Sequence, residues 1–267
     1  MKSTCFILGM IVMCIFLTSA IAQDVTAAVA QEEKDGQEVL KKSDEIRAPQ
    51  QPFTFDLNVI DYQKDAKTDK NEVKGETHFK VFVRGSHEDI YRSLVKWTHP
   101  IADQGKVMLM DGTVFWLYAP GTRNSIRISP AQRLAGLATS ADIASVNFER
   151  DYKVVFKCLE AVKGNLCHKL ILRGKTDEVA YYALELYISQ ATNRPVMCKY
   201  YAISGRLLKI AFFKQFKAAV GEERPHEIFI MDAVDENHTT RMLYAEMKLE
   251  EKPIFMYNKD YLPNIKD

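Results

Sequence analysis

The sequence predicts a mainly β protein with a few helices (α+β), built as a single curved antiparallel sheet that forms an unclosed β-barrel. Segments of alternating apolar and polar residues begin at Phe53–Val59 and continue through Phe79–Arg84, as is typical of half-buried strands. Short turns join many of these segments, and strands joined in this way run antiparallel. About a dozen strands are too many for one flat sheet. We therefore expect the sheet to curl, with the helices covering its concave apolar face.

Residues 1–22 have the pattern of a cleaved signal peptide. Lys2 precedes an apolar run from Phe6 to Leu17, and small side chains lie one and three residues before a cut after Ala22. The run is shorter than the ~20 residues that a membrane-spanning helix needs.

Without Lys2, the remaining 35 Lys and Arg balance the 35 Asp and Glu. This even charge argues against a nucleic-acid partner.

The mature chain divides into a flexible leader over residues 23–36 and one β domain over 37–267. We expect a short amphipathic helix over Gln37–Ile46, because its apolar residues have helical spacing and prolines follow it. An irregular insert is predicted over residues 121–147. In it, Ser129–Gly136 resembles a capped helix that Pro130 begins, and Ala141–Val146 has the pattern of a second helical turn.

The strands fall into two series on either side of this insert. In the first, Val107–Met110 and Val114–Tyr118 flank Asp111-Gly112, a dipeptide that favours a tight hairpin turn. The second series is predicted at Tyr152–Cys158, Cys167–Leu172, Tyr181–Ile188, Pro195–Ile203, Leu207–Phe216, Glu227–Val234 and Thr239–Leu249. Turn residues such as Gly164-Asn165 separate these strands and predict a meander.

Three cysteines remain after the signal peptide: Cys158, Cys167 and Cys198. Cys158 and Cys167 flank a predicted hairpin turn near their midpoint and are candidates for a cross-strand disulfide. The alternative is that all three are small buried apolar side chains, since a cross-strand bridge needs a specific geometry.

No motif in the sequence indicates an enzyme or a cofactor site. A glycine-rich phosphate loop, a Gly-x-Ser-x-Gly elbow and a His-Glu-x-x-His motif are missing from the sequence. The six histidines lack the spacing of metal ligands; they are His78, His87, His99, His168, His226 and His238. We therefore expect neither catalysis nor a bound metal.

The segment Leu207–Phe213 is apolar on both faces. A strand whose second face meets water would instead alternate between apolar and polar residues. One face packs in the core. The other meets either the protein's own helices or a cavity with apolar walls, and periodicity alone does not separate these two alternatives.

Several stretches together resemble one family. They are Trp116–Pro130 (WLYAPGTRNSIRISP), Asn147–Tyr152 (NFERDY), Tyr201–Lys209 (YAISGRLLK) and Arg224-Pro225. In their order they are similar to the bacterial outer-membrane lipoprotein-sorting proteins, which resemble the LolA and LolB carriers. The resemblance extends from about Glu38 to the C-terminus and implies an unclosed barrel wrapped around helices, with an apolar cavity that shields acyl chains in the periplasm.

This resemblance implies a carrier of lipid or lipoprotein acyl chains, with an inner-membrane exporter or an outer-membrane acceptor as further candidate partners. We expect the insert to cover the cavity. Candidate residues of the cavity and its cover are Phe115, Ile126, Ile128, Leu134, Leu137, Leu207, Ile210 and Phe212. Arg123, Arg127 and Arg133 are candidates for contact with a phosphate headgroup, and the alternative is that they form ion pairs with Glu149 or Asp151. The competing function is an envelope interaction or sensor module with the same fold and no lipid.

Overall fold

The computed structural model describes residues 31, 33–65, 67–85 and 91–265. The predicted signal peptide lies outside these residues, as does most of the predicted leader. A helix occupies residues 33–47, so it begins within the segment that the sequence assigned to the leader. Gly36 lies within this helix and is buried, and a Cβ atom at this position would lie 2.7 Å from Val154 Cγ1.

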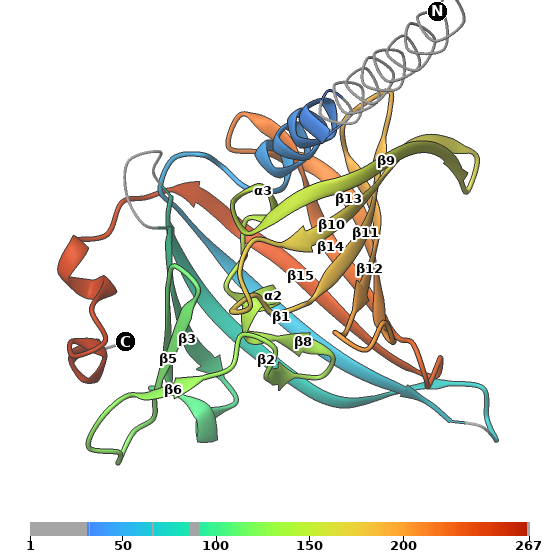
Figure 1. Cartoon of the computed structure of the whole chain (residues 1–267). Helices are drawn as coiled ribbons and strands as arrows, with labels where there is room; N and C mark the ends of the chain where they lie inside the picture. Colours follow the sequence, from blue (N-terminus) through green and yellow to red (C-terminus); the bar gives the residue numbers. More distant parts are fainter. Residues whose placement is uncertain (1–30, 32, 66, 86–90, 266–267) are drawn as a thin grey trace, which may run out of the picture.

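Within the described residues, thirteen strands form one antiparallel sheet in the order β6-β5-β4-β3-β2-β1-β15-β14-β13-β12-β11-β10-β9. The strands of this sheet are β1 (Phe53–Lys64), β2 (Asn71–Arg84), β3 (Arg92–His99), β4 (Val107–Asp111), β5 (Val114–Tyr118), β6 (Ile126–Ile128), β9 (Tyr152–Val162), β10 (Asn165–Gly174), β11 (Ala183–Ser189), β12 (Pro195–Tyr201), β13 (Leu207–Ala219), β14 (Glu222–Asp232) and β15 (His238–Leu249). The prediction of a single curved antiparallel sheet that does not close is confirmed (Figure 1).

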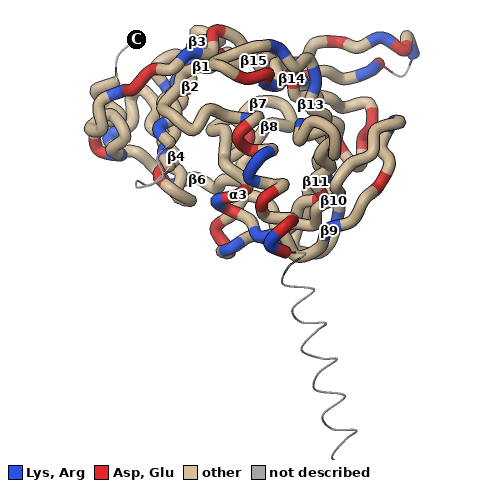
Figure 2. The backbone as a smooth tube through the Cα atoms, turned by 90° about the horizontal axis from the view of Figure 1, so that it is seen from above, with Lys and Arg blue, Asp and Glu red and all other residues tan. Residues whose placement is uncertain are grey.

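The first and last strands of the chain lie side by side in the middle of this sheet, because β1 pairs with β15. The two edge strands, β6 and β9, therefore come from the middle of the chain. The connection between them has to cross from one edge to the other. It does so inside the curve of the sheet, where Figure 2 shows β7 (Arg133–Ala135), β8 (Ala138–Thr139) and α3 (Phe148–Asp151).

This connection contains the short hairpin β7 (Arg133–Ala135) and β8 (Ala138–Thr139), followed by α2 (Ser140–Ile143) and α3 (Phe148–Asp151). The prediction of a helix at Ser129–Gly136 is wrong. The Ser129 hydroxyl accepts a bond from the amide of Ala131 at 3.2 Å, as a cap would, but no helix follows. The backbone instead turns at Gly136, whose φ is +52°, and returns as β8.

The second predicted helical turn corresponds to α2, although it is shorter than Ala141–Val146. Thr139 and Asp142 form a reciprocal capping box at its start, which satisfies backbone amides that a helix leaves without partners. The hairpin predicted at Asp111-Gly112 is also present, with Asp111 opposite Val114 and Gly112 at φ +62°.

The core lies on the concave face of the sheet and forms one continuous cluster of buried side chains. The convex face has a second, smaller cluster, where the C-terminal segment packs Tyr257 and Leu262 against Phe82, Leu94 and Leu109. That segment contains the short 3-10 helices Ile254–Tyr257 and Leu262–Asn264; a third, Ile101–Asp103, follows β3. No helix in the described part of the chain is long and apolar enough to cross a membrane.

We predict that Gly136→Ala destabilises the fold. A Cβ atom at this position would lie 2.4 Å from Asp61 Oδ1 and 2.5 Å from Thr240 Oγ1. The positive φ costs about 1 kcal/mol for alanine, and the overlap adds about 1–3 kcal/mol to the loss of unfolding free energy. Urea unfolding measures the total.

Gly205→Ala is the matched control, because Gly205 also has a positive φ, +78°, but has no atom within 4 Å of its Cβ position. An equal loss in the two variants would show that backbone strain alone acts at Gly136 and would contradict a tight fit of the hairpin tip.

Candidate functional site

The concave face of the sheet is covered by the helix of residues 33–47 and by residues 129–151. We call these two segments together the cover, and the helix of residues 33–47 the cover helix. Leu40 of the helix and Leu137, Ile143 and Phe148 of the second segment are each at most 3% exposed. They belong to the same apolar cluster as the inward side chains of the strands. The cover therefore fills the position that a second sheet occupies in a β-sandwich.

The C-terminal end of the cover helix is fixed by Arg224 of β14, which is 3% exposed. Its guanidinium donates to the carbonyl oxygens of Glu45 at 2.6 Å and Ile46 at 3.1 Å, and to that of Ala219 at 3.1 Å. A cation at this position binds the carbonyl groups that the last turn of a helix leaves unpaired, and it also interacts favourably with the helix dipole.

The N-terminal part of the same helix lies against the edge strand β9. The Gln37 side chain accepts a bond from the amide of Val154 at 3.1 Å and donates to the carbonyl of Tyr152 at 3.4 Å. Gly36 permits this approach, because a Cβ there would lie 2.7 Å from Val154 Cγ1. A side-chain amide thus replaces part of a neighbouring strand at this edge.

The two parts of the cover meet at a buried ion pair. Arg47 and Asp44 of the helix bind each other. Asp44 accepts from the amide of Glu149 at 2.6 Å, and the Arg47 guanidinium lies 3.9 Å from the centre of the Phe148 ring. Burial raises the pKa of Asp44, while Arg47 acts in the opposite direction. We call this contact between the helix and α3 the seam.

A second buried ion pair joins the cover to the sheet. Lys209 of β13, 3% exposed, binds the Asp142 carboxylate and donates to the Leu137 carbonyl at 3.1 Å. The Tyr181 hydroxyl donates to the same carboxylate at 3.0 Å. Burial lowers the pKa of Lys209 and Asp142 opposes this shift. A buried charge is costly unless it is paired and hydrogen-bonded, and both conditions hold here.

A third polar contact holds the tip of the β7–β8 hairpin. The Thr240 hydroxyl donates to Asp61 at 2.7 Å and accepts from the amide of Leu137 at 2.9 Å. His238 also contacts Asp61, at 3.0 Å. The hairpin tip is therefore seated on β1 and β15, the central strands of the sheet.

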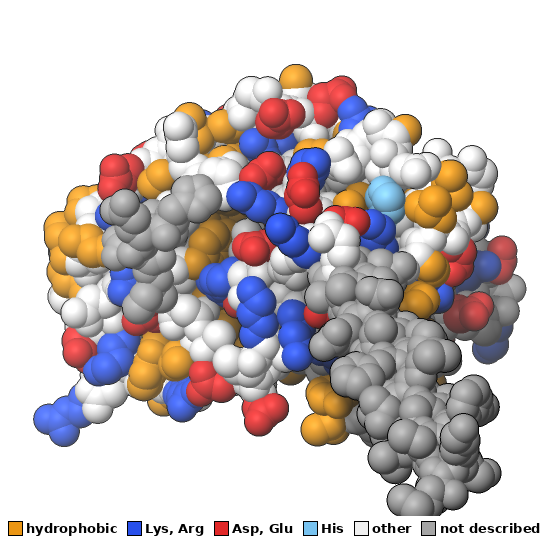
Figure 3. All heavy atoms as spheres, turned by 45° about the horizontal axis from the view of Figure 1, so that its top comes forward, with side chains coloured by type: hydrophobic (Ala, Val, Ile, Leu, Met, Phe, Trp, Pro, Cys, Tyr) orange, Lys and Arg blue, Asp and Glu red, His pale blue; other side chains and the backbone are white. Residues whose placement is uncertain are grey.

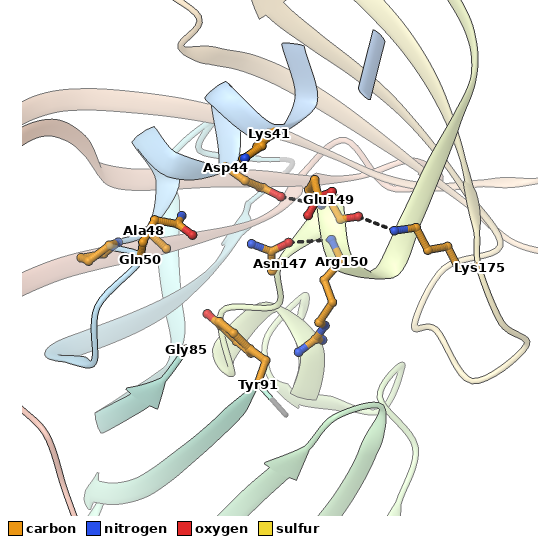
Figure 4. Close-up of a pocket in the computed structure, with 11 residues that line it drawn as sticks. Lys41, Asp44, Ala48, Gln50, Gly85, Tyr91, Asn147, Glu149, Arg150 and Lys175 are labelled. Carbon is orange, nitrogen blue, oxygen red and sulfur yellow. Dashed lines mark hydrogen bonds between the residues drawn. The ribbon is translucent and has the colours of Figure 1, made fainter. Parts of the chain in front are cut away.

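A polar pocket of about 500 Å³ opens beside the seam. We call it the mouth pocket. It is lined by Lys41, Asp44, Ala48, Pro49, Gln50, Gly85, Tyr91, Asn147, Glu149, Arg150 and Lys175. Figure 4 shows its side chains, which come from the cover helix and the residues after it, from the segment around α3, from the residues next to β2 and β3, and from Lys175 at the end of β10. Figure 3 shows several Lys and Arg side chains near the middle of the face on which the helix lies.

The structure divides the apolar residues that the sequence proposed for the cavity and its cover. Phe115, Ile128 and Leu137 are buried in the concave core, and Leu134 packs against it while partly exposed. Ile126 is 59% exposed. Whether the inward residues contact a ligand stays a prediction.

Leu207, Ile210 and Phe212 lie outside the concave core, so their contact with a ligand stays a prediction. From Lys209 onward the side chains alternate along β13, and its buried residues Lys209, Ala211 and Phe213 face the concave side. A register shift between Tyr200 and Tyr201 of β12 places Leu207 opposite Tyr201, on the other face from Lys209. Leu207, Ile210 and Phe212 lie opposite Tyr201, Lys199 and Met197 of β12 on the convex face. One face of β13 therefore belongs to the concave core, and the apolar side chains of its other face pack beside β12 on the convex side of the sheet.

The three candidate headgroup arginines do not form one cluster at the mouth pocket. Arg123 is exposed, Arg127 forms an ion pair with Glu178 at 3.0 Å and Arg133 forms one with Asp232 at 3.2 Å. Ion pairing was the predicted alternative, but the partners are not Glu149 or Asp151.

The cysteines are free thiols in the structure. Cys158 lies opposite Lys169 and Cys167 lies opposite Glu160, so the two are offset by two positions along β9 and β10 and no bridge joins them. Within the described ranges, no three His, Cys, Asp or Glu side chains gather as a metal site would require.

The residues that hold the cover were missed in the sequence. Lys209 gave a signal, because it interrupts an apolar strand between Leu208 and Ile210. Arg224 belongs to one of the stretches that carried the family resemblance, but its partners in the helix, Glu45 and Ile46, are almost 180 residues away.

Comparisons with known proteins agree with this architecture. A family model described as "Uncharacterized protein" matches residues 90–264. The crystal structure of a LolA superfamily protein from Nitrosomonas europaea is 31% identical, with a TM-score of 0.75 over 85% of this chain and 98% of that one. No curated protein sequence matches significantly.

Two further crystal structures share the fold at 16% identity. An outer membrane lipoprotein-sorting protein domain from Vibrio parahaemolyticus has a TM-score of 0.72, and a DUF1329 family protein from Desulfovibrio piger has one of 0.71. Each match covers 86% of this chain and 99% of the other.

We predict that Asp142→Asn lowers the free energy of unfolding by about 3–5 kcal/mol near neutral pH, because it leaves the Lys209 ammonium buried without a counter-charge. The deficit relative to the parent protein should shrink as pH rises towards 10.5, the ordinary pKa of lysine. In that window the unfolded chain binds the proton more strongly than the folded one, so stability increases with pH.

Urea unfolding of both proteins at about pH 7 and about pH 10 measures this difference. Asp142→Asn combined with Lys209→Met is the matched control and should recover part of the loss at neutral pH. A deficit that is independent of pH, with no recovery in the double variant, would contradict the assigned ion pair.

Proposed function

The chain belongs to the LolA superfamily, and from this premise we propose that it is a non-enzymatic carrier that holds lipid or lipoprotein acyl chains in the periplasm. The acyl chains would lie between the concave face of the sheet and the cover. The cargo would come from the inner membrane and leave for an outer-membrane acceptor.

The observation that carries this proposal is the kind of contact that holds the cover. Its inward side chains are apolar, but its attachments are a few polar groups: Arg224 at the helix end, Lys209 with Asp142, and Thr240 at the hairpin tip. These groups exchange protein partners for water when the cover lifts. The apolar surface of the sheet that is then exposed needs another apolar partner in place of the cover.

An acyl chain is a fitting substitute. Exposing it to water costs ~0.8 kcal/mol per methylene group, and exposing the concave face costs ~25 cal/mol per Å². Both costs are removed when the chain replaces the cover on the sheet. The interior is filled by Leu40, Leu137 and Phe148 in the closed form, so cargo would enter by displacing them rather than through a permanent opening.

A second candidate is an envelope interaction or sensor module without lipid. The observation in its favour is the exposed apolar surface of β9 and β10, where Phe156, Leu159 and Leu166 are 53%, 50% and 49% exposed. Edge strands of this kind are templates for pairing with another chain.

Mass spectrometry of organic extracts from the mature protein, purified from its own periplasm without detergent, separates the two functions. We predict a stoichiometric lipid or acylated peptide. An empty extract that stays empty after incubation with lipid would reject the carrier and favour the interaction module.

Movement of the cover helix is tested by a reversible lock. Gly36→Cys with Val154→Cys places two Cβ atoms about 3.4 Å apart, close to the ~3.5–4.5 Å of natural disulfides. The native thiols are removed by Cys158→Ser, Cys167→Ala and Cys198→Ala. We predict that the oxidised protein takes up a fluorescent fatty acid at least about tenfold more slowly than the reduced protein, because the helix cannot leave β9.

The reduced form of the same variant is the matched control for folding, and the single variant Val154→Cys in the same background, which keeps Gly36 and its close approach to β9, controls for the oxidant. Equal uptake by the oxidised and reduced forms would contradict a moving helix while leaving lipid binding itself to be judged by the extraction.

A further inference from the structure

The mouth pocket is the polar cavity nearest to the seam, and its charges favour an anion. Lys41, Lys175 and Arg150 line it together with the carboxylates Asp44 and Glu149. Asp44 is already paired with Arg47, and Arg150 with Asp151. The two lysines therefore face a single remaining carboxylate, that of Glu149.

Arg150, which lines the same pocket, has two of its three guanidinium nitrogens bound to a carboxylate. Its Nε and Nη2 atoms bind the two oxygens of Asp151 at 2.6 and 2.7 Å, and the guanidinium lies 4.7 Å from the centre of the Tyr91 ring. The remaining nitrogen, Nη1, is buried and has no hydrogen-bond partner. A buried donor without a partner is costly in free energy, so an oxygen acceptor that reached this atom would stabilise the complex.

The neighbouring groups are arranged around the same space. Lys175 donates to the carbonyl of Glu149 at 2.8 Å, and Asn147 accepts from the amide of Arg150 at 2.7 Å. Figure 4 shows both contacts, with Lys41 on the cover helix on the other side of Asp44. The pocket volume of about 500 Å³ is within the range of small-molecule sites.

We propose that the mouth pocket binds the phosphate group of a lipid whose acyl chains lie under the cover. This inference rests on the proposed carrier function and assigns the headgroup chemistry to it. A planar guanidinium donor and ammonium groups are the side chains that recognise phosphate oxygens. The pocket lies where the cover helix and α3 meet, so a lipid could place its phosphate there and its chains beneath the helix.

The test compares two lipids with the same acyl chains, phosphatidylglycerol and diacylglycerol, by displacement of a bound fluorescent fatty acid from the full mature chain. We expect the parent protein to prefer phosphatidylglycerol by about tenfold. Lys41→Gln with Lys175→Gln should reduce the preference to about twofold or less without changing the affinity for diacylglycerol.

The matched control is Lys67→Gln with Lys217→Gln, which removes the same charge from two exposed lysines outside the pocket and should keep the preference. Arg150→Gln is a second variant, with circular dichroism to confirm folding, and should also lose the preference.

The outcomes separate the proposals. Equal affinity of the parent protein for both lipids would overturn the phosphate site and leave the carrier intact, whereas binding of neither lipid would overturn both. Calorimetric titration with inorganic phosphate distinguishes the source of the anion. Tight binding of free phosphate, lost in the double lysine variant and without any lipid preference, would overturn a lipid-borne ligand.

Discussion

The structure depends on one constraint: an open sheet with an apolar concave face has to be covered by something other than another sheet. The two edge strands, β6 and β9, do not meet within the described residues, so closing the barrel does not solve the problem. The chain covers this face with the helix of residues 33–47 and with the connection between the two edges. Because that connection must cross the concave side, the topology itself supplies part of the cover. The polar contacts of Lys209, Arg224 and Thr240 then fix its position.

Much of the fold could be predicted because short stretches of neighbouring residues determine its strands and turns. Alternation identified most strands of the sheet, and Asp111-Gly112 and Gly164-Asn165 identified their turns. The helix at Ser129–Gly136 was mistaken because Ser and Pro form the same cap before a turn as before a helix. What decides between them is the contact of Gly136 with Asp61 and Thr240, which lie far away in the sequence.

The candidate site was less predictable for the same reason. Leu207, Ile210 and Phe212 were assigned to the interior because hydrophobicity alone does not tell which face of a strand looks inward. In β13 the inward positions include the charged Lys209. A pattern of apolar and charged residues would place this lysine in water, whereas the structure buries it. Its partner Asp142 and the helix contacts of Arg224 depend on long-range packing that single-sequence patterns do not report.

The glycine at the tip of the β7–β8 hairpin has a mechanical consequence. A Cβ atom at Gly136 would overlap Asp61 and Thr240, and the amide of the next residue, Leu137, binds Thr240 directly. A shift of the hairpin by one residue would place a side chain where only glycine fits. Release of this segment is then a discrete event, like a latch, rather than a graded loosening. In the proposed carrier, uptake of cargo would therefore have a threshold.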